Sequence, residues 1–106
     1  MANEIIVLIT ASSKEEAARI GTALVDERLA ACVNIVPQIR SLFFWEGKTQ
    51  GQDETLLIVK SRLPLLEHII DRVKALHSYT VPEVIALPIV GGSSEYLRWL
   101  GETTKG

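Results

Sequence analysis

The chain has 106 residues, of which 47 % are hydrophobic and 23 % are charged, an ordinary composition for a single globular domain spanning 1–106. Lys and Arg number 11 against 13 Asp and Glu, a net charge of −2, so the basic excess typical of nucleic-acid binding is lacking and we expect no nucleic-acid partner. The apolar run Ile5–Ile9 is too short for a signal peptide or a membrane span, and the single cysteine cannot form an internal disulfide. We therefore expect a cytoplasmic protein that has no membrane partner.

The chain begins with a predicted strand and a predicted helix. The run EIIVLIT (4–10) is continuously apolar and β-branched, which indicates a strand covered on both faces or flanked on both sides by other strands. The helix that follows begins at a capping box made by Ser13 and Glu16, or one residue earlier by Ser12 and Glu15.

The helix is amphipathic and its apolar stripe ends near Leu29. The run ACVNIVPQIRSLFFW (31–45) then reads as a long strand. Glu46 and Gly47 reverse the chain, and 48–61 forms a second long strand. This part of the sequence therefore predicts an extended hairpin.

The second half of the chain adds a helix, a strand and a terminal helix. The run LPLLEHIIDRVKALH (63–77) predicts a helix with Pro64 in its first turn. A fourth strand is expected over 81–90, and a short helix capped by Ser93 or Ser94 ends the chain.

This β-α-β-β-α-β order with a terminal helix predicts an α+β fold, a ferredoxin-like split β-α-β sandwich with a long hairpin between its second and third strands. That fold places the first and third strands in the centre of an antiparallel sheet. Proline cannot donate to a strand ladder and is confined to outer strands, ends and bulges. Pro37 falls in the second strand, and Pro82 and Pro88 in the fourth, which agrees with outer positions for both strands.

The hairpin is longer than the helices that could cover it. Its first strand of about 13 residues spans roughly 43 Å at ~3.3 Å per residue, whereas a helix of about 14 residues covers only ~21 Å. The distal half carries Phe43, Phe44 and Trp45. A bare two-stranded ribbon is marginal in water, so we interpret these aromatic residues as an oligomerisation arm that a second copy of the chain covers.

Several motifs resemble the CutA family of divalent-cation tolerance proteins. They are RLAACVNIVP, SLFFWEGK and YTVPEVIALPIVGGSSEYLRWL, and the resemblance runs from Ile5 to about Leu100. It implies a fold similar to that of the PII signalling proteins, and a tight homotrimer in which long hairpins join neighbouring sheets. It also implies a role in tolerance of divalent metals, copper especially.

The resemblance further implies where a metal would bind. In copper-binding CutA proteins the ligands are ascribed to a cysteine in the first strand and to two histidines at the end of the second helix. Only His77 matches here, because Ile9 and Leu76 stand at the other two positions. The candidate metal residues are therefore His77, with Cys32 and Glu83 as helpers. We expect no obligatory cofactor, and modest binding of Cu²⁺ or another divalent cation.

Each of these residues also has a purely structural interpretation. His77 can serve as a cap at the C-terminus of a helix, where its charge favours the helix dipole. Cys32 lies among apolar neighbours and can act as a small hydrophobic side chain. His68 falls off the apolar stripe of its helix, so we expect it to be solvated.

Four further residues at motif positions leave two interpretations open. They either pack at an interface or line ligand clefts between subunits, and they are Lys60, Tyr79, Trp45 and Trp99. The second interpretation gives the alternative function, a PII-like small-molecule sensor. No Ser-His-Asp, HExxH or CxxC spacing is present, so we expect no enzyme. An enzyme that uses Cys32, or Lys60 with Glu83, ranks last among the three functions considered, after divalent-cation tolerance and small-molecule sensing.

Overall fold

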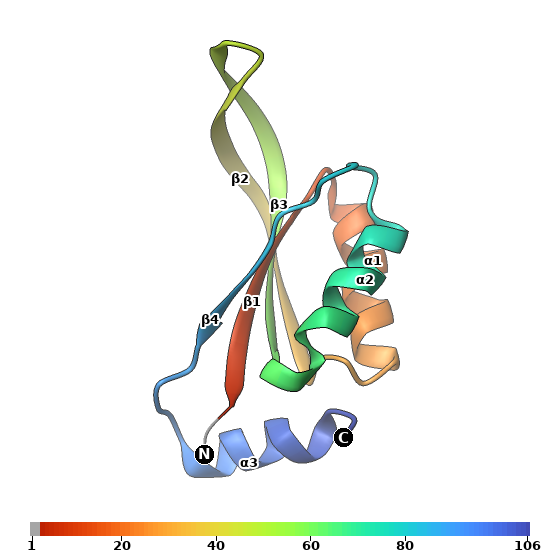
Figure 1. Cartoon of the computed structure of the whole chain (residues 1–106), viewed down its shortest axis with the longest axis vertical. Helices are drawn as coiled ribbons and strands as arrows, with labels where there is room; N and C mark the ends of the chain where they lie inside the picture. Colours follow the sequence, from red (N-terminus) through yellow and green to blue (C-terminus); the bar gives the residue numbers. More distant parts are fainter. Residues whose placement is uncertain (1–2) are drawn as a thin grey trace.

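A four-stranded antiparallel sheet with two helices on one face and a third helix across one end forms the molecule (Figure 1). The structure is a computed structural model that describes residues 3–106; residues 1–2 of the predicted domain lie outside this range. In chain order the elements are β1 (Glu4–Ala11), α1 (Lys14–Asp26), β2 (Cys32–Trp45), β3 (Lys48–Arg62), a 3₁₀ turn (Leu63–Leu65), α2 (Leu66–Leu76), β4 (Val84–Pro88) and α3 (Ser94–Thr103). The predicted α+β fold is confirmed.

The strand order is β2-β3-β1-β4, so β1 and β3 are central as predicted. Pro37 lies where the pairing of β2 with β3 is interrupted, between Val36 and Ile39. There the Thr55 hydroxyl donates to the Pro37 carbonyl at 3.0 Å. The outer position of β2 thus accommodates a residue that has no N–H to donate.

The fourth strand is shorter than the predicted 81–90, because β4 covers only Val84–Pro88. Pro82 therefore precedes the strand instead of lying in it, and Pro88 is its last residue. The segment ahead of β4 has to pass around the end of β1 before it can pair, and that path leaves it outside the ladder (Figure 1).

Two helix boundaries also differ from the prediction. Helix α1 ends at Asp26 and not near Leu29, because Arg28 adopts a left-handed conformation with φ 59°. The chain turns there, and the Leu29 N–H donates back to the Leu24 carbonyl at 2.9 Å. The predicted helix over 63–77 is a 3₁₀ turn containing Pro64 followed by α2.

The hydrophobic core lies between the sheet and the pair α1 and α2. Side chains from the helix-facing side of β1 and β3 meet those of the two helices, and the largest of them have 0 % exposure: Val7, Ile9, Ile20, Leu24, Leu57, Val59, Ile69 and Val73. Within residues 3–106 no helix is long and apolar enough to cross a membrane.

Neither α1 nor α2 covers the opposite side of the sheet, and α3 contacts that side only at the end near Cys32 (Figure 1). We call it the open face; strand alternation assigns to it Ile6, Leu8, Val36, Leu56, Ile58, Ile85 and Leu87. These residues are half-buried or exposed, with Ile85 at 52 % and Leu87 at 48 %. Of the two alternatives predicted for the first strand, the flanked one is confirmed, because β1 pairs with β3 on one side and with β4 on the other, while only one of its faces is covered within a single copy.

The hairpin extends beyond the rest of the sheet, as predicted. Strand β1 pairs with β3 only over Thr55–Arg62, so the remainder of β3 has β2 as its single neighbour. Glu46 and Gly47 both have positive φ, 52° and 79°, which suits the tight turn of a hairpin. The aromatic residues at the tip are exposed: Phe43 by 38 %, Phe44 by 73 % and Trp45 by 60 %.

Candidate functional site

His77 follows the last residue of α2 and turns its ring into the protein, where the side chain has 0 % exposure. Its Nε2 lies 2.7 Å from the Thr10 carbonyl, and its Nδ1 lies 3.0 Å from the Tyr79 backbone N. A carbonyl can only accept and a backbone N–H can only donate. The ring is therefore the neutral tautomer with hydrogen on Nε2, and both of its nitrogens are engaged.

Glu16 is the buried acid beside this histidine, with 3 % exposure and an Oε1 that lies 3.7 Å from His77 Nδ1. Its carboxylate accepts from the Ser12 N–H at 2.9 Å, from the Ser12 hydroxyl at 3.0 Å and from the Ser78 N–H at 2.8 Å. Ser13 caps α1 by accepting the Glu16 N–H at 3.1 Å, which confirms half of the predicted capping box. The returning bond reaches Ser12 instead of Ser13.

These contacts lower the pKa of Glu16. Burial raises the pKa of the carboxyl, but the hydrogen bonds from Ser12 and Ser78 favour the ionised form and outweigh burial, so the pKa falls from 4.5 to about 2. Glu16 is thus a buried anion that joins the start of α1 to the segment after α2.

Tyr79 connects this network to the base of the hairpin. Its ring packs against His77 with 4.6 Å between ring centroids, and its hydroxyl donates to Glu54 Oε2 at 2.8 Å. The same hydroxyl accepts from Gln52 Nε2 at 2.8 Å. Burial, and then the hydrogen bond to Glu54, raise the pKa of Tyr79 to about 12, so the phenol stays protonated at neutral pH.

The three predicted metal residues do not meet within one chain. Cys32 is in register with Lys60, whereas His77 contacts Thr10, which is in register with Leu56. Lys60 and Leu56 are four residues apart along β3, which places Cys32 about 13 Å from the position that His77 contacts. Among residues 3–106 no group of three or more His, Cys, Asp and Glu side chains could hold a metal ion.

Cys32 instead belongs to a group that we call the polar corner: Cys32, Asn34, Lys60 and Tyr96. Lys60 Nζ lies 4.0 Å from Cys32 Sγ and donates to Asn34 Oδ1. Burial, and then the Cys32 thiol, raise the pKa of the Tyr96 hydroxyl. The Tyr96 ring packs against Trp99 with 5.4 Å between centroids. Of the four predicted cleft residues, the structure gathers Lys60 and Trp99 around this corner, while Tyr79 and Trp45 lie elsewhere.

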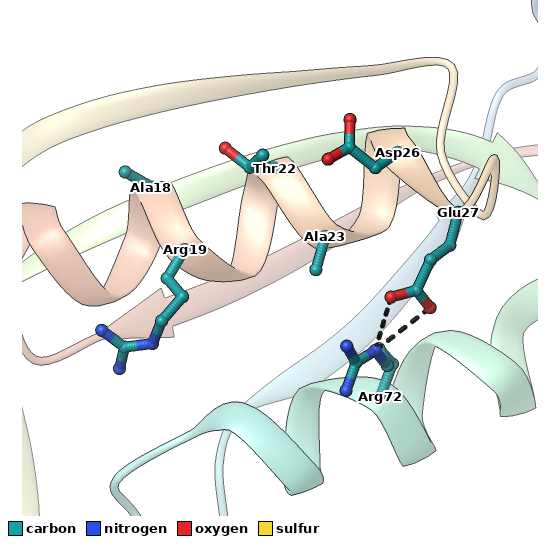
Figure 2. Close-up of a pocket in the computed structure, with 7 residues that line it drawn as sticks. All are labelled: Ala18, Arg19, Thr22, Ala23, Asp26, Glu27 and Arg72. Atoms are coloured by element: carbon teal, nitrogen blue, oxygen red, sulfur yellow. Dashed lines mark hydrogen bonds and ion pairs between the residues drawn. The ribbon is translucent and has the colours of Figure 1, made fainter.

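A groove of about 520 Å³ runs along the outer surface between α1 and α2, and none of the predicted site residues lines it. Figure 2 shows Arg72 of α2 facing Glu27 across the groove, with Arg72 Nε at 2.8 Å from Oε2 and 3.1 Å from Oε1. Both side chains of the ion pair are more than one-third exposed, so the pair contributes little to stability. The groove is a surface feature of the helix layer, remote from the polar corner.

The sequence model of a known family, the CutA1 divalent ion tolerance protein, matches residues 5–103. The chain belongs to the CutA family. The divalent-cation tolerance protein CutA of Thermus thermophilus is 54 % identical over 101 residues, which cover 95 % of this chain and 98 % of that protein. The crystal structure of CutA1 from Oryza sativa superposes with a TM-score of 0.96 at 50 % identity, covering 98 % of this chain and 95 % of that one.

Plant members of the CutA family are longer than this chain. The chloroplastic CutA of Arabidopsis thaliana is 52 % identical over 101 residues, which cover 95 % of this chain but 56 % of that protein. The chain thus spans little more than half the length of that relative. The names of these CutA proteins describe tolerance of divalent cations and specify no reaction.

Sequence reasoning assigned Glu16 only to a helix cap and did not single out Asn34, Glu54 or Tyr96. The signal for Asn34 was available, since a polar residue between apolar ones in a strand stands out on its face. The capping box gave no signal for the other partners of Glu16, because Ser78 and His77 come from a distant part of the chain.

The low pKa of Glu16 predicts a pH dependence of stability. Because the folded-state pKa lies below the ordinary value, the carboxylate stabilises the fold fully above about pH 4.5, by roughly 3 kcal/mol, and this contribution is lost as the pH falls toward 2. We expect Glu16→Gln to be less stable at pH 7 and to lose less stability between pH 4.5 and 2. Denaturant unfolding at fixed protein concentration measures both. Glu15→Gln, at the exposed neighbour, is the matched control, and an equal loss in both variants would contradict the assignment.

Proposed function

We propose that this chain forms a homotrimer that serves divalent-cation tolerance in the cytoplasm. The observation that carries assembly is the open face, an apolar sheet surface that α1 and α2 leave uncovered and that α3 contacts only at one end. Monomeric proteins rarely leave so extended an apolar surface in water, so a second copy is the economical cover. The number three comes from the resemblance to the family and not from the surface itself.

The sheet edges support the same proposal. Strands β2 and β4 are the two outer strands, and each presents backbone groups on its outer side. Two different edges that meet head to tail produce a heterologous contact, and such contacts close into rings when the rotation permits. The exposed hairpin tip adds a second apolar surface at a distance from the first. Cys32, the single cysteine, is free, which suits a reducing compartment.

Assembly is expected to depend on the middle of the open face. Ile58 is partly exposed in one copy, so Ile58→Glu should leave the fold of that copy intact but place an unpaired charge inside the assembly. A buried unpaired charge costs about 3–5 kcal/mol, enough to dissociate the variant at low micromolar concentration. Sedimentation velocity reports the species present.

Thr22→Glu is the control, because it places the same charge on the outer surface of α1, where Thr22 is exposed (Figure 2). The control should sediment as the wild type does. A wild-type protein that sediments as a folded monomer at micromolar concentration would rule out the proposal.

Metal binding in this proposal is direct but modest and centred on His77. A metal would take the place of the proton on Nε2, or of the Tyr79 N–H at Nδ1, so binding competes with existing hydrogen bonds. Only one family ligand position is retained, since Ile9 and Leu76 cannot coordinate, and a single imidazole holds a divalent ion weakly.

Calorimetric titration of metal-stripped protein with copper tests this part. We expect weak binding in the wild type and a clear loss in His77→Ala, with further weakening as the pH falls because only the neutral ring coordinates. His68→Ala, at an exposed histidine of the same helix, should bind as the wild type does. Equal affinity in all three proteins would remove His77 from the site, and Cys32→Ser would then be the next variant to titrate.

The polar corner favours a second candidate, a PII-like sensor that binds a small molecule between subunits. Lys60 supplies a cation, and among residues 3–106 no carboxylate lies within 4.0 Å of it. Such a group suits an anionic ligand. A thermal-shift screen with nucleotides and small carboxylates tests this candidate, since a ligand at 100 times its Kd stabilises by about 2.7 kcal/mol. The shift should vanish in Lys60→Met. If no compound shifts the melting temperature, divalent-cation tolerance is the better supported of the two functions.

A further inference from the structure

Cys32 and Lys60 in the polar corner place a thiol beside an amine, a pair that neither function above uses together. The two residues are directly opposite each other on β2 and β3, so their side chains lie on the same face of the sheet. Lys60 Nζ lies 4.0 Å from Cys32 Sγ. Because Cys32 is the single cysteine of the chain, any reaction of a thiol of this protein has to occur there.

The backbone on both sides of this pair is tied together. The Ala31 N–H, next to Cys32, donates to the Lys60 carbonyl at 2.9 Å. The hydroxyl of Ser61, which has 0 % exposure, donates to the Leu29 carbonyl at 2.6 Å. Strand pairing therefore keeps the thiol and the amine as neighbours, and only the side-chain torsions of the lysine remain to be adjusted.

The amine of Lys60 is not held in an ion pair. Among residues 3–106 no carboxylate lies within 4.0 Å of its Nζ, which contacts Asn34 Oδ1 and Cys32 Sγ instead. A carboxylate at that distance would favour the charged form of the amine, which is not a nucleophile.

The pair is also open to small reagents within one copy. Cys32 and Lys60 are both half-buried, so neither is sealed in the core. The neighbouring rings of Tyr96 and Trp99 on α3 are 42 % and 43 % exposed. A small molecule can therefore approach the thiol and the amine from the side of α3.

The distance between the two atoms suits the passage of an acyl group from sulfur to nitrogen. In a thioester on Cys32, the carbonyl carbon is bonded to Sγ and can lie one bond nearer to Lys60 Nζ than Sγ does. That brings it within the separation of about 3–3.5 Å at which positioned groups react. A direct bond between Sγ and Nζ would need a much closer approach and an oxidant, whereas acyl transfer needs only the free thiol that Cys32 provides.

We propose that Cys32 and Lys60 form an acyl relay, which takes an acyl group from a small thioester and leaves it on the lysine. The Cys32 thiolate attacks the carbonyl carbon of the donor. The bond from that carbon to the donor's sulfur breaks, and the departing thiolate takes up the proton that Cys32 lost. The acyl group is then a thioester on Cys32.

The second step moves the acyl group to nitrogen. Lys60 first releases its extra proton to water, and the free amine attacks the carbonyl carbon of the Cys32 thioester. The bond from that carbon to Sγ breaks, its electron pair stays on sulfur, and the second proton of the nitrogen passes to Sγ. The products are an amide at Lys60 and a regenerated Cys32 thiol, so the relay removes the positive charge of Lys60. It does not depend on the proposed assembly, because both residues belong to one copy.

Acetyl-coenzyme A, a small acyl thioester, is the probe that tests the relay. The intact wild-type protein is incubated with it at mildly alkaline pH, and peptide mass spectrometry measures the rate of acetylation at each lysine. We expect Lys60 to be acetylated faster than Lys48 and Lys74 by roughly tenfold or more, because only Lys60 has a thiol in reach. Lys48 and Lys74 are exposed and serve as controls within the same chain.

Three variants separate the relay from direct acetylation of a reactive lysine. Cys32→Ser and Cys32→Ala should lower the rate at Lys60 to that of the control lysines and leave the controls unchanged; two replacements are used in case one does not fold. In Lys60→Arg the acetyl group should remain on Cys32 as a thioester that hydroxylamine removes. Equal rates at Lys60 and Lys48 in the wild type, an unchanged Lys60 rate without Cys32, or no acetyl group on Cys32 in Lys60→Arg would each overturn the proposal.

Discussion

The unequal lengths of β1 and β3 are the constraint on which the rest of the structure depends. Strand β3 has 15 residues and β1 has 8, so β1 supports only the half of β3 from Thr55 to Arg62. The other half pairs with β2 alone, and a two-stranded ribbon gains little stability by itself in water. The protein therefore contains an arm whose stability has to come from contacts outside its own strands.

Part of that support comes from within the chain, through a buried polar network at the base of the arm. Glu16 holds the segment after α2 in place, His77 bonds the end of β1, and Tyr79 reaches from that segment to Glu54 and Gln52 of β3. His77 acts here as a structural residue, because both ring nitrogens already have partners. The same contacts explain why metal binding at this position is expected to be modest.

The rest of the support is proposed to come from other copies. Three features would be buried by further copies of the chain. They are the apolar open face, the outer strands β2 and β4, and the aromatic hairpin tip.

The sequence by itself determined the order of the elements, the outer positions of the strands that carry proline and the exposure of Phe44 and Trp45, because each follows from local periodicity or from element length. It could not place Lys60 beside Cys32 or Glu16 beside His77. Alternation assigns residues to a face, but the register between strands is set by turns and by irregularities such as the one at Pro37. Only the tertiary structure decided those neighbours, since contacts between distant segments depend on how the sheet and helices pack and not on any short stretch of sequence.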